Sequence, residues 1–344
     1  MADAEAHSFE DEEQRGKRTS VRDRGSDEVF GRMGPAGAHS RLASKMQQEE
    51  VSISAPLLVL AGPTSAGKSD AAIEVALRFD AVILSADAMQ VYRKMDIGTG
   101  KVSVEEQQLV PHEGIDIVDP DQSFNAADFI ALTDEVMSRH DRVVVAGGSS
   151  LYIRSMIRGL VPAPPVDPAY RRHLEAATDL HEQLALVDPP LAARLHFNDR
   201  VRLIRGLEVH QSTGRRLSDL QAEHATMPDR IRAVGVWLDR PNLAERINAR
   251  VHMMVDAGYV AEVSALLDSG YSRELKPMQS LGYRYFCAHL LDSLPLDEAI
   301  RLTQRDTRHF SRKQRNWKRQ LGFVEAFDDH CQAAMEVAEQ LWDK

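Results

Sequence analysis

Apolar runs rich in β-branched residues alternate with segments of helical periodicity along most of this chain. The runs that predict strands are LLVLA (57–61), AVILS (81–85), IDIVD (115–119), RVVVAGG (142–148) and AVGVWLD (233–239). Helical patterns lie between them, for instance at 69–78 and 125–140. Such alternation is typical of a parallel sheet covered by helices on both faces, so we predict an α/β fold.

The pattern changes near Pro162. The Pro-rich segment VPAPPVDP is followed by a stretch, 168 to about 226, that has helical periodicity throughout, and strand character returns at 231. We therefore expect a helical insertion in an α/β core, with hinges near 160–167 and 226–231. The expected divisions are a tail (1–50), a first part of the core (51–164), the insertion (165–228) and a second part of the core (229–344).

Residues 1–50 differ from the rest in composition. They mix both charges with Gly and Ser and lack apolar periodicity, which predicts disorder. The acidic cluster at 10–13 does not suit a mitochondrial transit peptide, and no apolar leader segment precedes it. Met33 or Met46 would serve equally as a start.

The composition narrows the class of protein. The chain has 344 residues, 43% of them hydrophobic, and no run approaches the ~20 apolar residues that a membrane span needs. The two cysteines, Cys287 and Cys331, form no metal-binding or disulfide framework, which suits a reducing cytoplasm. A net charge of −10 argues against nucleic-acid binding over the whole surface but not against a local basic patch. We expect a cytoplasmic monomer.

The segment GPTSAGKS, at 62–69, has the spacing of a phosphate-binding loop between a strand and a helix. Such a loop surrounds phosphates with backbone N–H groups. Lys68 would supply a point charge and Ser69 is a candidate Mg²⁺ ligand. The expected diphosphate-binding residues are Gly62, Pro63, Thr64, Ser65, Ala66, Gly67, Lys68 and Ser69.

The acidic residues that follow the strands indicate which ligand carries those phosphates. An ATPase usually has a strand ending in an acid that organises Mg²⁺ and water. The strand RVVVAGGSSLY ends in glycines and hydroxyls, whereas AVILSADAMQVY ends in Asp87. Asp87 is therefore a magnesium-organising acid, a carboxylate that caps local backbone, or a catalytic base.

The position of Asp87 favours the catalytic base. Loops at the carboxyl ends of parallel strands converge on one crevice, so the phosphate loop, Asp87 and the turn at 147–149 should face one another. Ser149 would then bring a hydroxyl within reach of Asp87. A phosphate clamp, a carboxylate and a hydroxyl suit the displacement of a diphosphate leaving group by a weak nucleophile.

Several further segments carry a resemblance to a known family. They are SADAMQVYRKMDIGTGK (85–101), AGGSSLY (146–152), NDRVRLIRGLEV (198–209), RINARVHMMVDAGYVAEV (246–263), LGYR (281–284) and TRHFSRKQRNW (307–317). With the phosphate loop they resemble the tRNA dimethylallyltransferases, also called isopentenylpyrophosphate transferases, over roughly residues 56–320. The resemblance implies a P-loop-kinase-like core, Mg²⁺, and transfer of a dimethylallyl group from dimethylallyl diphosphate to N6 of the adenine next to the anticodon of tRNA.

The resemblance also implies roles for particular residues. Asp87 would be the general base, Ser149 would help to position Asp87 and the adenine, and Arg250 would join Lys68 on the diphosphate. The anticodon stem-loop would contact residues around the target adenine and residues in the helical insertion. These residues are Asp87, Ala88, Met89, Gln90, Ser149, Arg171, Val201, Arg202, Leu203, Ile204, Arg205, Gln279, Ser280, Leu281, Gly282, Tyr283 and Arg284.

The chain departs from the family pattern near these residues. Ala88 stands where serine is usual, and Ser149 where threonine is usual, which loses a branch that stiffens the side chain. Gly100 and Gly206 replace common alanines, and SRKQRNW replaces the usual A-K-R-Q-x-T-W. Three other functions stay open: an adenylate isopentenyltransferase that acts on a free nucleotide, an ATP-dependent small-molecule kinase, and a non-catalytic RNA-binding module.

A basic stripe favours RNA over a free nucleotide. Arg301, Arg305, Arg308, Arg312, Arg315 and Arg319 recur at steps of four and three residues, which places them on one helical face. Lys313 and Lys318 flank the stripe, and Asp306 is its only acid. In an acidic chain we interpret this as a track for an RNA backbone, with Trp317 as a candidate for base stacking. The alternatives are a solvated helix face and a core tryptophan.

Overall fold

The computed structural model describes residues 56–162, 167–327 and 329–343. The N-terminal tail predicted to be disordered lies outside the described residues. The strands are β1 (Leu57–Ala61), β2 (Val82–Ser85), β3 (His112–Glu113), β4 (Val143–Gly147), β5 (Ala233–Leu238) and β6 (Val324–Ala326). They form one sheet in the order β3-β2-β4-β1-β5-β6, and every neighbouring pair is parallel.

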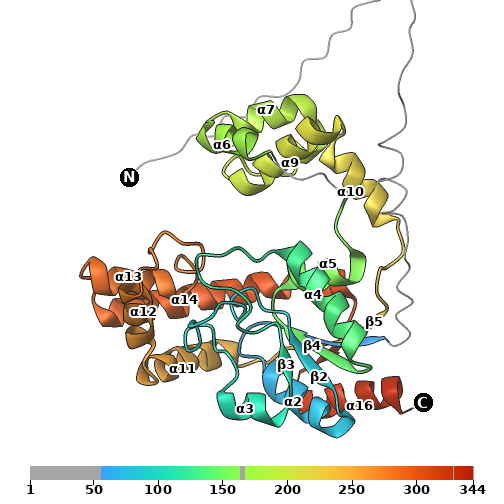
Figure 1. Ribbon diagram of the computed structural model, residues 1–344, viewed down its shortest axis with the longest axis vertical. Coiled ribbons are helices and arrows are strands. Elements are labelled where there is room, and N and C mark those ends of the chain that lie inside the picture. Colours follow the sequence, from blue (N-terminus) through green and yellow to red (C-terminus); the bar gives the residue numbers. More distant parts are fainter. Residues whose placement is uncertain (1–55, 163–166, 328, 344) are drawn as a thin grey trace, which may run out of the picture. The chain divides into compact units, whose positions relative to one another are not determined.

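Helices cover both faces of this sheet (Figure 1). In chain order, the helices before residue 160 are α2 (Lys68–Phe79), α3 (Val104–Leu109), α4 (Ala126–Arg139) and α5 (Ser150–Arg158). Those that follow β5 are α11 (Leu243–Asp256), α12 (Tyr259–Asp268), α13 (Tyr283–Leu291), α14 (Leu296–Arg315), α15 (Lys318–Leu321) and α16 (His330–Trp342). The predicted α/β fold is confirmed. None of the helices in the described ranges is long and apolar enough to cross a membrane.

The alternation of strand side chains explains the two layers of core. Leu58 and Leu60 of β1 pack with the helices α2 and α16, whereas Leu57 and Val59 point to the other face. On that second face they meet Phe129 of α4 and other buried side chains from α5, α12 and α13. Because both faces are covered, the strands are apolar throughout rather than alternating with polar residues.

Two edges of the sheet differ from the sequence prediction. The run at 115–119 does not form a strand; β3 is instead the short His112–Glu113. Gly114 and Asp116 both have positive φ, 80° and 55°, so the chain turns where a strand was predicted. Strand β6 was missed, because its three residues give too short a pattern to recognise.

The segment after β4 and α5 is helical, as its periodicity predicted. It contains α6 (Pro168–Ala176), α7 (Leu180–Val187), α8 (Pro189–Ala192), α9 (Arg200–Thr213) and α10 (Leu217–Ala225). These helices have an apolar core of their own, in which Leu174, Leu184 and Leu203 are fully buried. The chain leaves and re-enters the α/β core at adjacent points, since Arg230 N, shortly before β5, donates to Ile157 O of α5 at 2.7 Å.

Candidate active site

The phosphate loop joins β1 to α2 and has the strained backbone that such loops need. Ser65 and Gly67 have φ values of 64° and 96°. A Cβ at Gly62 would lie 2.1 Å from Leu238 O, so only glycine allows β1 to lie this close to β5. Helix α2 starts at Lys68 without a side-chain cap. Its first N–H groups are therefore available to an anion.

Two cations lie at this loop. Lys68 Nζ donates to Pro63 O at 2.7 Å, and Arg250 Nη2 donates to Gly100 O at 3.2 Å. Burial lowers the pKa of Lys68 to about 8, while Asp87 raises it and Arg250 lowers it. Burial likewise lowers the pKa of Arg250, opposed mainly by Asp87. Both cations are thus poorly solvated and would gain from a polyanionic ligand.

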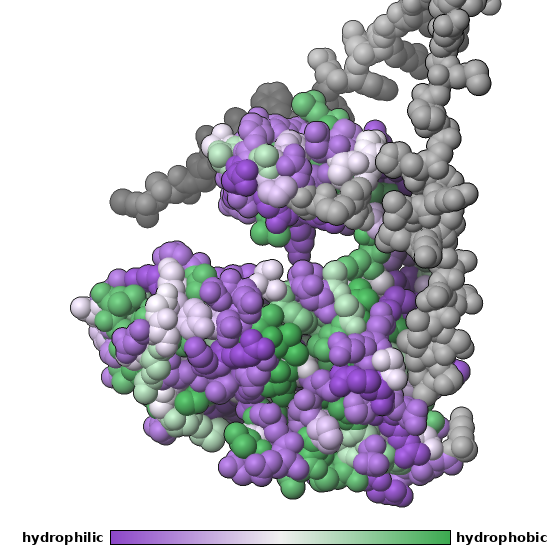
Figure 2. Space-filling view, viewed as in Figure 1, coloured by the Kyte–Doolittle hydropathy of each residue, from purple (hydrophilic) through white to green (hydrophobic). Residues whose placement is uncertain are grey.

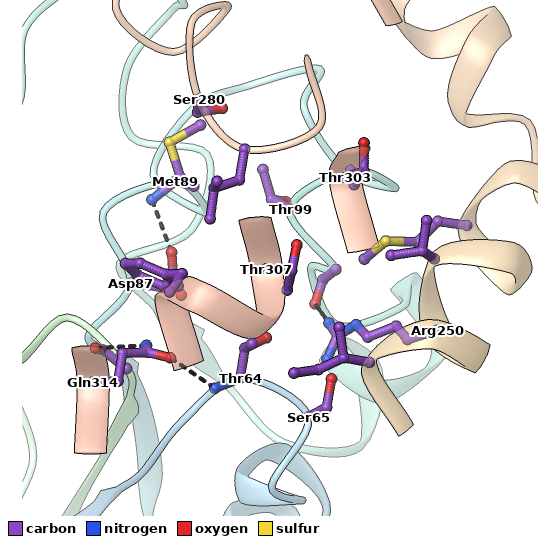
Figure 3. Close-up of a pocket in the computed structure, with 18 of the residues that line it drawn as sticks. Thr64, Ser65, Asp87, Met89, Thr99, Arg250, Ser280, Thr303, Thr307 and Gln314 are labelled. Carbon is purple, nitrogen blue, oxygen red and sulfur yellow. Dashed lines mark hydrogen bonds between the residues drawn. The ribbon is translucent and has the colours of Figure 1, made fainter. Parts of the chain in front are cut away.

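Asp87 follows β2 and lies on a turn beside Met89 (Figure 3). Its Oδ1 accepts from Met89 N at 2.9 Å. Ser149 Oγ accepts from Ala88 N at 2.9 Å, so the contact seen for this hydroxyl is with backbone and not with the Asp87 carboxylate. The expectation that Ser149 supports Asp87 directly is therefore revised. Its support passes through the backbone, because a hydroxyl at the start of α5 meets the turn one residue beyond Asp87.

A carboxylate that sequence reasoning missed fixes the loop at 96–98. Glu262 of α12 accepts from the backbone N–H groups of Asp96, Ile97 and Gly98, at 2.8, 2.6 and 3.0 Å. It also accepts from Tyr283 OH at 2.7 Å. The carboxylate of Glu262 thus ties together two of the segments on which the family resemblance rests. No sequence signal singled out Glu262, because its partners lie far away along the chain.

These parts surround one cavity of about 1320 Å³. Of the predicted site residues, Thr64, Ser65, Gly67, Lys68, Ser69, Asp87, Ala88, Met89, Gln90, Ser149, Arg250, Gln279, Ser280, Leu281, Tyr283 and Arg284 line it. Gly62, Pro63 and Ala66 shape the loop behind it, and Gly282 is buried. In the view of Figure 2, the surface of the α/β part of the protein is mostly hydrophilic, with hydrophobic residues (green) near its middle. Apolar side chains such as Leu281, Met254 and Val251 also line the cavity, so it can hold an apolar group beside an anion.

The predicted RNA contacts of the helical segment form a second group. Val201 is 80% exposed and Arg202 is exposed. Leu203 and Ile204 lie in the core of the helical segment, so their side chains are not available to RNA. Arg171 and Arg205 both reach the buried Glu208.

Arg171 donates to both carboxylate oxygens of Glu208, at 2.6 and 2.8 Å. Arg205 Nη1 lies 3.8 Å from the same carboxylate. Glu208 is only 3% exposed, and a buried carboxylate needs such partners. The structure therefore gives Arg171 a role in the fold that the sequence did not reveal.

The basic stripe differs from its prediction in extent and in pairing. Helix α14 ends at Arg315, and Arg319 lies on the separate helix α15, so the stripe is not one continuous face. Arg315 is held by both oxygens of Asp239, at 2.8 and 2.7 Å. Arg308 donates to Asn248, and Arg301 pairs with Glu298.

Arg312 and Lys313 remain exposed, and neither forms an ion pair with any residue that the structure describes. With Arg319 of α15, which is also exposed and has no ion pair among the described residues, they are the cations of this region best placed to meet an RNA backbone. The other stripe residues that have partners on the protein would have to give them up to bind RNA.

The residues near the loop fit a bound magnesium ion. Mg²⁺ usually takes one or two protein oxygens and completes its shell with phosphates and water. Ser69, Asp70 and Asp87 all line the cavity. Within the described ranges there is no cluster of three or more acids, histidines or cysteines.

The fold and this site define an α/β protein in which the loop between β1 and α2 opens on a large cavity that also has an apolar wall. The chain belongs to the IPP transferase family, whose model matches residues 90–321. It is 46% identical over 274 residues to tRNA dimethylallyltransferase 2 of Geotalea uraniireducens (strain Rf4), covering 76% of this chain and 88% of that protein.

Solved structures show the same relationship. The full-length tRNA isopentenylpyrophosphate transferase from Bacillus halodurans has 32% identity and a TM-score of 0.60, over 83% of this chain and 95% of that one. A eukaryotic dimethylallyltransferase acting on tRNA has the same fold, with a TM-score of 0.71 at 22% identity, over 84% of this chain and 77% of that one.

Proposed function

We propose that this protein transfers a dimethylallyl group from dimethylallyl diphosphate to N6 of the adenine on the 3′ side of a tRNA anticodon, releasing diphosphate. The observation that carries the proposal is the cavity that joins the phosphate loop, Arg250, Asp87 and an apolar wall. Family membership supports it, since the relatives named above are tRNA dimethylallyltransferases.

The groups of the cavity suit each part of this reaction. The bond between N6 and the allylic carbon forms, and the bond from that carbon to the diphosphate oxygen breaks. Lys68, Arg250 and the free N–H groups at the start of α2 stabilise the negative charge that gathers on the leaving diphosphate. Mg²⁺, held by Ser69, would supply further charge neutralisation when bound.

The adenine amine is a weak nucleophile because its lone pair is delocalised into the ring. It becomes nucleophilic only if its proton is taken as the new bond forms, and the Asp87 carboxylate takes it. The bond from Met89 N to Oδ1 holds the carboxylate in place and leaves Oδ2 for that proton. Reaching the base requires it to leave its stack, which is easiest in a single-stranded loop.

We further propose that the enzyme acts as a monomer in the cytoplasm, a reducing compartment that suits the free thiols of Cys287 and Cys331. A free adenine nucleotide is the closest competing acceptor. The exposed Arg202, Arg312 and Lys313 favour a large polyanion such as tRNA over a single nucleotide.

The deciding experiment incubates the protein with labelled dimethylallyl diphosphate and either total tRNA or AMP. We expect label in tRNA and none in AMP. Label in AMP alone would make the protein an adenylate prenyltransferase, and rapid ATP hydrolysis without any prenyl transfer would make it a kinase-like enzyme.

A further inference from the structure

Gln314, in the last turn of α14, lies between the phosphate loop and the turn after β4 (Figure 3). In the proposed reaction the first would hold the leaving diphosphate, and the second leads to Ser149 beside the turn of Asp87. Its Oε1 accepts from Thr64 N of the phosphate loop at 3.0 Å. Its Nε2 donates to Gly148 O, on the turn after β4, at 3.0 Å. The side chain is 5% exposed, so neither bond exchanges readily with water.

The backbone of Gly148 is adapted to this contact. A Cβ at position 148 would lie 2.4 Å from Gln314 Nε2, closer than any real side chain allows. Gly148 is not among the residues with positive φ, so its backbone conformation does not itself require glycine. The absence of a side chain at Gly148 thus leaves space for the amide of Gln314.

The end of α14 is itself anchored. The next residue, Arg315, binds both oxygens of Asp239, which directly follows β5. The end of α14 that carries Gln314 is therefore tied to the end of β5 by a contact that involves neither loop. From Gly148 the path continues to Ser149, whose Oγ accepts from Ala88 N beside Asp87.

We propose that Gln314 is a positioning residue that sets the spacing between the leaving-group end and the proton-accepting end of the site. This inference rests on the proposed prenyl transfer. The neutral amide offers one acceptor and one donor, as Thr64 N–H and the Gly148 carbonyl require. Methionine offers neither at similar size, and an ionised glutamate offers acceptors on both sides and repels the Gly148 carbonyl.

The first test measures kcat and KM for Gln314→Met and Gln314→Glu. Because a misplacement of about 1 Å can slow a reaction ~10²-fold, we expect kcat to fall by roughly 10–10² in both variants. KM for dimethylallyl diphosphate should stay within about twofold, since Lys68 and Arg250 are untouched. Ser311→Ala is the matched control, because Ser311 is 4% exposed on the same helix and bonds only its own helix.

The second test asks whether the effect passes through the two loops. Gly148→Ala should slow transfer in the wild type but have little effect on a Gln314→Ala background, where the amide is gone. When Ser149→Ala and Gln314→Met are combined, the loss in kcat should likewise be smaller than the product of the two separate losses. Gln314 would be an ordinary core residue if these pairs of effects multiply fully, or if the Gln314 variants keep wild-type kcat.

The two proposals fail in different ways. A wild type that transfers no prenyl group to tRNA removes the proposed function and the role of Gln314 with it. A wild type that does so, with Gln314 variants of equal kcat, removes only the positioning role. Thermal melting of every variant checks that the fold is intact, and Gly148→Ala tests the contact even if both Gln314 variants unfold.

Discussion

The guanidinium of Arg250 lies against Gly100 and donates to its carbonyl oxygen at 3.2 Å. Gly100 has a φ of 60°, and a Cβ there would lie 1.7 Å from Arg250 Nη2. The guanidinium could not occupy this place beside an alanine. The pair therefore sets where this protein holds its second cation.

Gly100→Ala should therefore move Arg250 and raise KM for dimethylallyl diphosphate by about tenfold, the scale of one charge-assisted hydrogen bond. Backbone strain at positive φ should also lower the free energy of unfolding by about 1 kcal/mol. Gly214→Ala is the matched control, because Gly214 has a φ of 68° and nothing within 4 Å. Equal KM values in the two variants, measured by steady-state kinetics, would contradict this role for Gly100.

Asp87→Asn keeps the shape of the side chain but removes its basicity. Turnover should fall by on the order of 10²–10⁴, because the adenine amine loses its proton acceptor. The affinity for tRNA, measured by filter binding, should change far less. Near-normal turnover would show that Asp87 serves the turn through Met89 N alone.

Much of this architecture could be predicted from the sequence, because it depends on local patterns. Apolar strand runs predicted most of the sheet, and the spacing of GPTSAGKS predicted the loop and the start of α2. The contacts made by Gln314 and Glu262 could not be predicted in this way. Gln314 meets a partner 250 positions away, and Glu262 meets one 164 positions away, so only the folded chain shows them.

The basic stripe was recognised from the sequence, but the partners of its arginines were not. Its spacing correctly placed most of the arginines on one helix, but spacing says nothing about neighbours. Asp239 and Asn248 come from other segments and hold Arg315 and Arg308. A charge pattern therefore indicated a face without indicating which of its charges remain exposed.

The lowered pKa of Lys68 should appear in stability. The folded pKa is about 8 against a usual 10.5, so the unfolded chain binds the proton more readily between these values. The free energy of unfolding should therefore rise as pH increases from about 8 to 10.5, by at most a few kcal/mol. Lys68→Met should lose this rise, which chemical denaturation at several pH values would measure.

The same group should make diphosphate binding depend on pH. The ligand favours charged Lys68, so affinity for inorganic diphosphate should be steady below about pH 8 and weaken up to tenfold per unit above it. Lys68→Arg stays charged and controls for the ionisation of diphosphate itself. Calorimetry that finds the same pH profile in both proteins would show that Lys68 does not titrate in this range.

Arg171→Gln should test the buried pair with Glu208. It leaves a carboxylate that is 3% exposed with only the more distant Arg205, and we expect a loss of about 1 kcal/mol in stability because Arg171 itself is partly exposed. Arg172→Gln, an exposed neighbour on α6, is the control. If both variants melt together while only Arg171→Gln weakens tRNA binding, Arg171 is an RNA contact and not a structural residue.

The salt dependence of tRNA binding should separate the exposed charges of α14 from the paired ones. Each cation that neutralises a phosphate releases counterions, so removing one should reduce the slope of log affinity against log salt by roughly 0.7–0.9. We expect this reduction for Arg312→Gln and again when Lys313→Gln is added, since both side chains are exposed. Arg301→Gln removes the same charge from the same helix, but Arg301 is bound to Glu298 through two hydrogen bonds of 2.7 Å. Its slope should match the wild type. If Arg312→Gln and Arg301→Gln change the slope equally, the effect comes from overall charge, and this end of α14 is not a track for the RNA backbone.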